Sequence, residues 1–321
     1  MTRTARAYTN IALIKYWGKK DPQLKLPFTN SLSLTLDRFY TDTKATIIDS
    51  DHDVIYLNEQ LLDDTKNQRI VNYLNTVRQM YSFTEHFQID SVNHVPTSAG
   101  FASSASGFAA LAVAINETKQ LQLDSRQLSI LARNGSGSAC RSIYGGFVEW
   151  QAGTDNQSSF AAPIDENPNI DLSLLSVVVD KHSKKISSTL GMKNSVKTSP
   201  FYSNWVTLVA SEINEIKQAI AKKDLQKIGE ISEHNAMSMH ALTLSANPSF
   251  TYFAPETIEI IQLIQEIRQK GIFAYATIDA GPNVKIICTK ESLRKVQQYI
   301  EQQLSNVSTV IANIGPGIQL V

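Results

Sequence analysis

Cysteine is scarce in this chain of 321 residues, which contains only Cys140 and Cys288, and the two have no paired spacing. A disulfide framework or a cysteine zinc site needs closely patterned cysteines, so both are excluded. The six histidines also show no metal-ligand spacing; they are His52, His86, His94, His182, His234 and His240. The composition therefore predicts a protein of a reducing compartment without a zinc site.

An excess of one charge and long apolar runs are lacking as well. Thirty lysines and arginines balance thirty aspartates and glutamates, so no net charge attracts nucleic acid or an anionic membrane. There is no run of about 18 apolar residues, and the start, MTRTARAYTN, lacks the apolar core of a signal peptide. We expect a soluble, cytoplasmic protein without a nucleic-acid or membrane partner, in which local groups hold any bound anion.

Apolar residues make up 42% of the chain, enough for a large core, and its length is typical of two domains. Residues 4–17, 30–36, 44–49 and 53–58 have strand patterns, whereas 66–80, 103–119 and 124–133 have helical ones. Polar residues 153–169 indicate a loop, and 199–244, 255–270 and 291–304 indicate helices. We predict an α+β protein with mixed sheets, helices packed on them and a cleft between two domains, 1–185 and 186–321, with the last strand able to return to the first domain.

The stretch PTSAGFASSAS, residues 96–106, combines small residues with four serines directly before an apolar helix. The first turn of a helix has unpaired backbone N–H groups that bind anions, and small residues let a phosphate approach them. Neither a Walker A motif nor a Rossmann fingerprint is present. On composition alone, a phosphate loop and a serine-rich turn that caps a core helix are equally good interpretations.

Three other stretches are unusual for purely structural segments: YTNIALIKYWGKKD at 8–21, NGSGSACRSIYGGFVEW at 134–150 and YATIDAGPNVKII at 275–287. Lys15 could simply extend its stem along an apolar surface. The Gly/Ser run could be a linker, although its hydroxyls and Arg141 also suit a carboxylate or a phosphate. Asp279 could merely form an Asx turn, which is the commoner role of an aspartate beside Gly and Pro.

The loop at 96–106 resembles the Pro-x-x-x-Gly-Leu-x-Ser-Ser phosphate loop of the GHMP small-molecule kinase superfamily, with Phe101 where leucine is usual. The three other stretches together closely resemble signatures of the mevalonate diphosphate decarboxylase family, a branch of that superfamily. The matches span both halves of the chain. They imply a two-domain GHMP kinase fold, ATP and Mg²⁺, and a homodimer.

The resemblance implies specific roles for individual residues. Asp279, Lys15 and Arg141 are predicted to be catalytic, with Arg141 on the substrate carboxylate. The other predicted substrate-binding residues are Tyr16, Trp17, Lys19, Ser136 and Ser138. The predicted ATP-binding residues are Ser98, Ala99, Gly100, Ala102, Ser103, Ser104, Ser106, Lys184 and Ser188, and Ser103 is also the predicted Mg²⁺ ligand. Cys140 lies in this region, and we interpret it as a small buried residue rather than a reactive thiol.

The family reaction converts mevalonate 5-diphosphate and ATP into isopentenyl diphosphate, CO₂, ADP and phosphate, in the mevalonate pathway of isoprenoid biosynthesis. Phosphorylation makes the tertiary 3-hydroxyl a good leaving group, and its departure drains the electrons released as CO₂ leaves. Three alternatives remain: a kinase that phosphorylates a small alcohol without decarboxylation, a decarboxylase of the monophosphate, and a non-catalytic nucleotide-binding protein. The last should have lost the loop serines or Asp279, and all are present.

Overall fold

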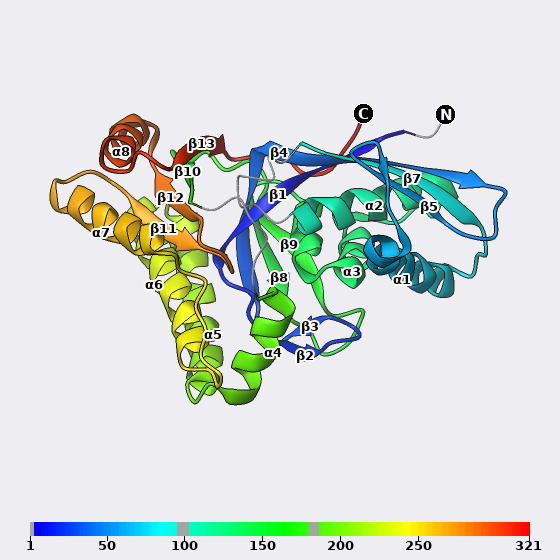
Figure 1. Cartoon of the computed structure of the whole chain (residues 1–321), viewed down its shortest axis with the longest axis horizontal. Helices are drawn as coiled ribbons and strands as arrows, with labels where there is room; N and C mark the ends of the chain where they lie inside the picture. Colours follow the sequence, from blue (N-terminus) through cyan, green and yellow to red (C-terminus); the bar gives the residue numbers. More distant parts are fainter. Residues whose placement is uncertain (1–2, 95–102, 180–185) are drawn as a thin grey trace.

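The computed structural model describes residues 3–94, 103–179 and 186–321, and its strands form two main sheets and a small hairpin (Figure 1). The first sheet has the order β14-β1-β4-β7-β5-β6, and β8 and β9 extend it beside β4. Its strands are β1 (Ala5–Ile14), β4 (Ser31–Ile48), β5 (Val54–Leu57), β6 (Gln60–Leu61), β7 (His86–Asn93), β8 (Phe147–Gln151), β9 (Phe160–Asp165) and β14 (Gln319–Leu320).

The long strand β4 organises this sheet because its two halves have different neighbours. Residues 31–34 pair with β8, residues 41–48 pair with β7, and β1 lies antiparallel along the opposite edge. The ladder between β1 and β4 ends at the pair Ile14–Leu32. The residues that follow Ile14 therefore leave the sheet, and they include Lys15, Tyr16 and Trp17.

Helices α1 (Asp64–Tyr81), α2 (Ser103–Lys119) and α3 (Ser125–Gly135) gather beside the first sheet (Figure 1). The short 3-10 helix η2 (Gly137–Ile143) follows α3 in the chain. The helix predicted at 103–119 is confirmed with the same bounds, and its apolar side chains are buried on nearly all sides. Helix α3 begins where the Asp124 carboxylate accepts the Gln127 N–H at 2.8 Å. Its end delivers the chain directly into η2.

The second sheet is antiparallel, with the order β11-β12-β10-β13. Its strands are β10 (Ser173–Val178), β11 (Tyr275–Ile278), β12 (Val284–Cys288) and β13 (Ser308–Asn313), and the separate hairpin is β2 (Lys19–Asp21) with β3 (Leu26–Pro27). The remaining helices are α4 (Ser188–Thr198), α5 (Tyr202–Ala221), α6 (Leu225–Leu244), α7 (Pro255–Gln269) and α8 (Lys290–Gln303). The two strands predicted around the DAGPN turn are confirmed as β11 and β12.

The largest core cluster joins the two halves of the molecule. It contains Ile11 and Leu13 of β1 together with Val209 and Ile213 of α5. Strand β10 pairs within the second sheet although it precedes residue 185, and β14 returns to β1. The division at 185 stays a prediction. In the structure, β9 still pairs within the first sheet, whereas β10, the next strand, pairs within the second.

The prediction of a loop over 153–169 is wrong in its second half, where β9 pairs with β8. The strand pattern is hard to recognise because Pro163 interrupts it. Proline is tolerated there because β9 has β8 as its only strand neighbour in the described sheet, and an edge strand does not need every N–H for pairing.

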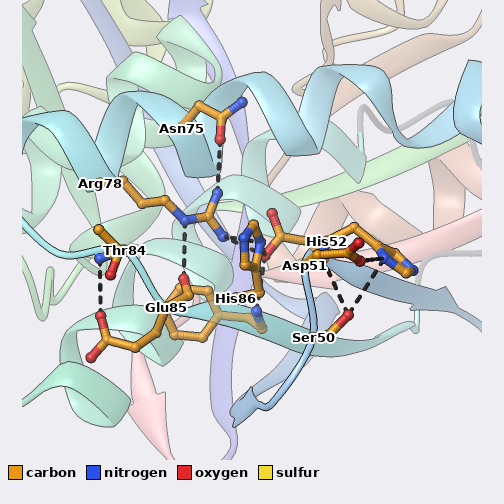
Figure 2. A network of polar contacts seen from close by, with 10 residues as sticks. Ser50, Asp51, His52, Asn75, Arg78, Thr84, Glu85 and His86 are labelled. Atoms are coloured by element: carbon orange, nitrogen blue, oxygen red, sulfur yellow. Dashed lines mark hydrogen bonds and ion pairs between the residues drawn. The ribbon is translucent and has the colours of Figure 1, made fainter.

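A polar network ties the end of α1 to the sheet (Figure 2). The Arg78 guanidinium pairs with the buried Asp53 carboxylate, and Arg78 also donates to the Glu85 carbonyl at 3.0 Å and to the Asn75 side chain at 2.8 Å. Asp53 accepts the Phe87 N–H at 2.9 Å as well. These contacts fix the last turn of α1 against the start of β7.

Within the described ranges, none of the helices has the length and apolar character that crossing a membrane requires.

Candidate active site

A cavity of about 310 Å³ lies where the chain leaving β1, the turn after β11, and the first turns of α2 and α4 meet. Its described lining includes five cationic side chains, those of Lys15, Lys19, Lys25, Arg69 and Arg141, and one carboxylate, that of Asp279. Although the chain as a whole is neutral, this cavity is strongly positive. It therefore suits a substrate with several negative charges.

Lys15 and Asp279 form an ion pair inside the cavity, with 2.8 Å between Nζ and Oδ1. Lys15 is fully buried and also donates to the Ala12 carbonyl at 2.8 Å, whereas 40% of the Asp279 side chain is exposed. Burial lowers the pKa of Lys15 below its ordinary value, and the attraction of Asp279 opposes this shift. The pair thus presents a carboxylate to the cavity and holds its cation behind it.

Arg141 reaches the same cavity from η2. Its guanidinium donates to Ser31 Oγ at 2.5 Å and to Asn10 Oδ1 at 3.2 Å and 3.4 Å. A guanidinium has five N–H groups, and Arg141 makes three such contacts with the described residues, so its fork retains capacity for a carboxylate. Burial lowers the pKa of Arg141 from its ordinary value.

Asn10 is a cavity residue that sequence reasoning missed. Its amide donates to the Ser138 carbonyl at 3.1 Å and to Ser142 Oγ at 2.8 Å, and its oxygen accepts from Arg141. Asn10 therefore ties β1 to η2. The only signal was a polar side chain within an otherwise apolar strand, which is too common to single it out.

The Gly/Ser run is a built part of the site and not a linker. Ser136 ends α3, Gly137–Ile143 form η2, and Ser136, Gly137 and Ser138 all line the cavity. A Cβ on Gly137 would lie 2.8 Å from the Trp150 ring and 3.1 Å from the Tyr16 ring. Close packing against these rings is the reason for glycine here.

Tyr16 and Trp17 form the aromatic wall of the cavity. The Tyr16 ring packs edge-on against the Trp150 ring with 4.7 Å between the ring centroids, and burial raises the pKa of Tyr16. Within the described part of the chain, neither the Tyr16 hydroxyl nor the Trp17 indole N–H has a hydrogen-bond partner. Trp17 also packs in the largest core cluster, so it contributes mainly the shape of its ring to the cavity wall.

Lys19, Lys25 and Arg69 form a cationic rim, and the sequence predicted only the first of them. Arg69 of α1 donates to the Gly135 carbonyl at 3.2 Å, and Lys25 donates to the Asn134 carbonyl. Burial and the neighbouring cations lower the pKa of Lys25 to about 8, and burial also lowers the pKa of Lys19 and Arg69. The lowered pKa values mean that keeping these clustered side chains charged costs free energy, and such a cluster fits a site whose ligand is an anion.

Two helix N-termini face the cavity, that of α2 through Ser104 and Ala105, and that of α4 through Ser187, Ser188 and Thr189. Ser104 and Ser188 therefore line the cavity at helix N-termini, which are places suited to phosphate groups, and their assignment to ATP stays a prediction. Ser98, Ala99, Gly100, Ala102 and Lys184 lie outside the described residues, as does the side chain of Ser103.

Ser106 differs from the other loop serines. Its side chain is fully buried, its Oγ lies 2.8 Å from Thr41 Oγ1, and it does not line the cavity. Its contact with β4 anchors the second turn of α2. Cys140 is buried as well, and desolvation raises the pKa of its thiol to about 12. The thiol is therefore protonated near pH 7, which agrees with a small buried residue rather than a reactive one.

A second cavity of about 240 Å³ adjoins the first beside α2. Its walls are mostly apolar and include Ile55, Phe108 and Leu111, while Arg69 and Ser104 line both cavities. A ligand with a flat apolar part and an anionic part could therefore extend from one cavity into the other.

Two family models match nearly the whole chain. The diphosphomevalonate decarboxylase-like N-terminal domain matches residues 7–161, and the mevalonate 5-diphosphate decarboxylase C-terminal domain matches residues 174–315. The chain belongs to the diphosphomevalonate decarboxylase family. The resemblance drawn from its motifs is thereby confirmed.

Individual members of the diphosphomevalonate decarboxylase family match over nearly their full length. The diphosphomevalonate decarboxylase of Candida albicans is 36% identical, over 98% of this chain and 96% of that protein. A solved structure of mevalonate diphosphate decarboxylase from Staphylococcus aureus has a TM-score of 0.95 and 42% identity, over 99% of this chain and 97% of that one. The MDDEF structure in complex with MVAPP, AMPPCP and magnesium has a TM-score of 0.95 and 44% identity, over 99% of this chain and 98% of that one. The predicted α+β GHMP kinase fold is confirmed.

Proposed function

We propose that this chain catalyses the ATP-dependent decarboxylation of mevalonate 5-diphosphate to isopentenyl diphosphate, with release of ADP, phosphate and CO₂. One observation carries the proposal most directly. The Asp279 carboxylate, backed by the buried Lys15 ammonium at 2.8 Å, opens into a cavity whose other charged side chains are all cationic among the described residues. The names of the family members support the same reaction.

Asp279 is the group proposed to accept the proton of the 3-hydroxyl, or to orient that hydroxyl towards the γ-phosphate. Its carboxylate lines the cavity with 40% of the side chain exposed, and the Lys15 ammonium holds one of its oxygens at 2.8 Å. Phosphoryl transfer depends mainly on position and charge neutralisation. A carboxylate held rigidly against a buried ammonium meets the positional requirement.

Arg141 is proposed to hold the substrate carboxylate, because its planar fork is braced by Ser31 and Asn10. The diphosphate would be bound by Lys19, Lys25, Arg69, Tyr16 and the hydroxyls of Ser136 and Ser138. Holding both ends of the substrate fixes the 3-hydroxyl between them.

The N-termini of α2 and α4 are proposed to bind the ATP phosphates through backbone N–H groups and the hydroxyls of Ser104 and Ser188. The roles of Ser98, Ala99, Gly100, Ala102, Ser103 and Lys184 stay predictions from the resemblance. The adjoining apolar cavity, which shares Ser104 and Arg69, offers room for the base of the nucleotide.

The residues present fit Mg²⁺ brought in by the nucleotide. Among the described residues no group of three or more His, Cys, Asp or Glu could hold a metal, and Mg²⁺ commonly relies on phosphates, waters and one or two protein oxygens. Ser104 and Asp279 could supply such oxygens, as could Ser103 by the resemblance. When bound, the ion would neutralise charge on the transferring phosphoryl group.

The test is an assay with mevalonate 5-diphosphate and ATP in which ADP and CO₂ are followed together. We expect equal yields from the wild-type protein. Asp279→Ala should lower turnover by about 100- to 10,000-fold, the loss expected when an essential proton acceptor is removed, while nucleotide binding stays nearly intact. ADP without CO₂ would instead identify a kinase, and preference for the monophosphate would identify the other enzymatic alternative.

A homodimer remains a proposal that rests on the family resemblance, and a cytoplasmic location remains one that rests on the few unpaired cysteines and the start of the chain. Light scattering of the purified protein across a concentration series measures the first. A constant mass of one chain would exclude it.

A further inference from the structure

Helix α6 contacts both elements that carry the Lys15–Asp279 pair. Lys15 follows β1 in the first half of the chain, and Asp279 follows β11 in the second. Helix α6 packs along β11 and against β1 (Figure 1). Two of its buried polar side chains, Asn235 and His240, make their contacts at the backbone beside the pair.

Asn235 holds the backbone of Lys15. Its Oδ1 accepts the Lys15 N–H at 2.7 Å, and its Nδ2 donates to Glu212 Oε2 at 2.6 Å. The other Glu212 oxygen lies 2.6 Å from His234 Nδ1 at the surface. Because Lys15 lies beyond the last β1–β4 ladder pair, its buried N–H depends on this side chain. The amide must keep its orientation, since only its NH₂ group can donate to Glu212.

His240 holds the backbone directly before Asp279. Its Nε2 lies 3.3 Å from the carbonyl of Ile278, the last residue of β11, so Nε2 carries the proton and donates. The ring packs against Phe253 with 4.3 Å between ring centroids. Burial, with a further contribution from Lys15, lowers the pKa of His240 to about 4, so the imidazole is neutral near pH 7.

We infer that Asn235 and His240 are positioning residues that together set the Lys15–Asp279 pair. The inference rests on the proposed function, which assigns that pair to the reaction. Apolar side chains would suffice if α6 only filled the core, and a buried polar side chain costs free energy unless it is hydrogen-bonded. Here each polar side chain contacts the main chain within one residue of a reacting group. The two contacts lie five residues apart on one rigid helix, about 7.5 Å along its axis, so they fix the two strand ends relative to each other.

The test compares substitutions that remove each contact with one that keeps it. His240→Leu and Asn235→Leu should lower kcat by about 10- to 100-fold while KM for both substrates changes less than twofold, because binding groups stay in place and only the reacting pair moves. His240→Gln should recover at least a third of wild-type kcat, since its terminal NH₂ can reach the Ile278 carbonyl. Ser232→Ala is the matched control: its buried hydroxyl on α6 donates only to the Ile228 carbonyl at 2.7 Å, and turnover should stay within twofold of wild type.

A second readout does not depend on turnover. The distance between Lys15 Nζ and Asp279 Oδ1 should exceed 3.5 Å in a crystal structure of His240→Leu, and an unchanged distance of 2.8 Å would overturn the inference. If Asn235→Leu does not fold, Asn235→Ser removes the same contacts without placing a large apolar side chain beside Glu212. Full kcat in the leucine variants alongside inactive Asp279→Ala refutes the positioning role alone, whereas an active Asp279→Ala refutes the proposed function.

Discussion

Replacing Lys15 with methionine should separate catalysis from folding at this site. Methionine keeps the volume of the buried stem and removes the ammonium that lies 2.8 Å from Asp279. Two unit charges at that distance attract by about 6 kcal/mol at an effective dielectric constant of about 20. Because 40% of the Asp279 side chain is exposed, solvent screens part of this attraction.

This attraction affects kcat only by the amount that it is stronger in the transition state than in the bound ground state. We take this difference as about 2 to 3 kcal/mol. The expected loss of kcat is therefore about 30- to 150-fold. Stability should change little, because removing a buried cation relieves its desolvation while the exposed Asp279 can turn to water.

The assay is steady-state release of ADP and CO₂ from mevalonate 5-diphosphate, with thermal unfolding measured on the same samples. Lys295→Met is the control, because Lys295 forms an exposed ion pair with Glu291 on α8, away from the cavity. A Lys15→Met protein that keeps more than a third of wild-type kcat would refute the role assigned to the pair.

Lys25 should make substrate affinity fall with rising pH. Its pKa is lowered to about 8, so most Lys25 side chains are charged at pH 7 and few at pH 9. KM for mevalonate 5-diphosphate should then rise by up to about tenfold between these pH values, the worth of one charge-assisted hydrogen bond. Lys25→Arg should show no such rise, and an equal rise in that variant would remove Lys25 from the explanation. Asp53→Asn should lower the free energy of unfolding by about 3 kcal/mol, because it leaves Arg78 buried without a counter-charge in the network of Figure 2. Denaturant titration measures this, the kcat of the folded protein should stay unchanged, and the exposed Asp51→Asn is the control; equal stability of the two variants would contradict the prediction.

The reaction was easier to predict than the full lining of the cavity. Asp279, Lys15 and Arg141 stand in short signatures, and the structure brings all three into one cavity. Lys25 and Arg69 carry no local signal, because one lies in the turn of the β2–β3 hairpin and the other on helix α1. In the structure they line the cavity and reach the carbonyls of Asn134 and Gly135, which are 109 and 66 residues away in sequence.

Edge pairing was another limit of the sequence. Strand β9 was taken for loop because its proline and polar residues match that composition, and only its partner β8 reveals a strand. In contrast, α2 was predicted to the residue because its apolar pattern and its start are both local properties.

By itself, the sequence indicated the groups on which the proposed chemistry rests: a helix start suited to phosphate, a Gly/Ser run suited to anions and an aspartate in a turn, each formed by neighbouring residues. The tertiary structure alone decided how these pieces face one another. Packing of α6 against β1 and β11 places a lysine of one half 2.8 Å from an aspartate of the other. Such contacts depend on how separate elements pack, and no local pattern encodes the distance between two residues 264 positions apart.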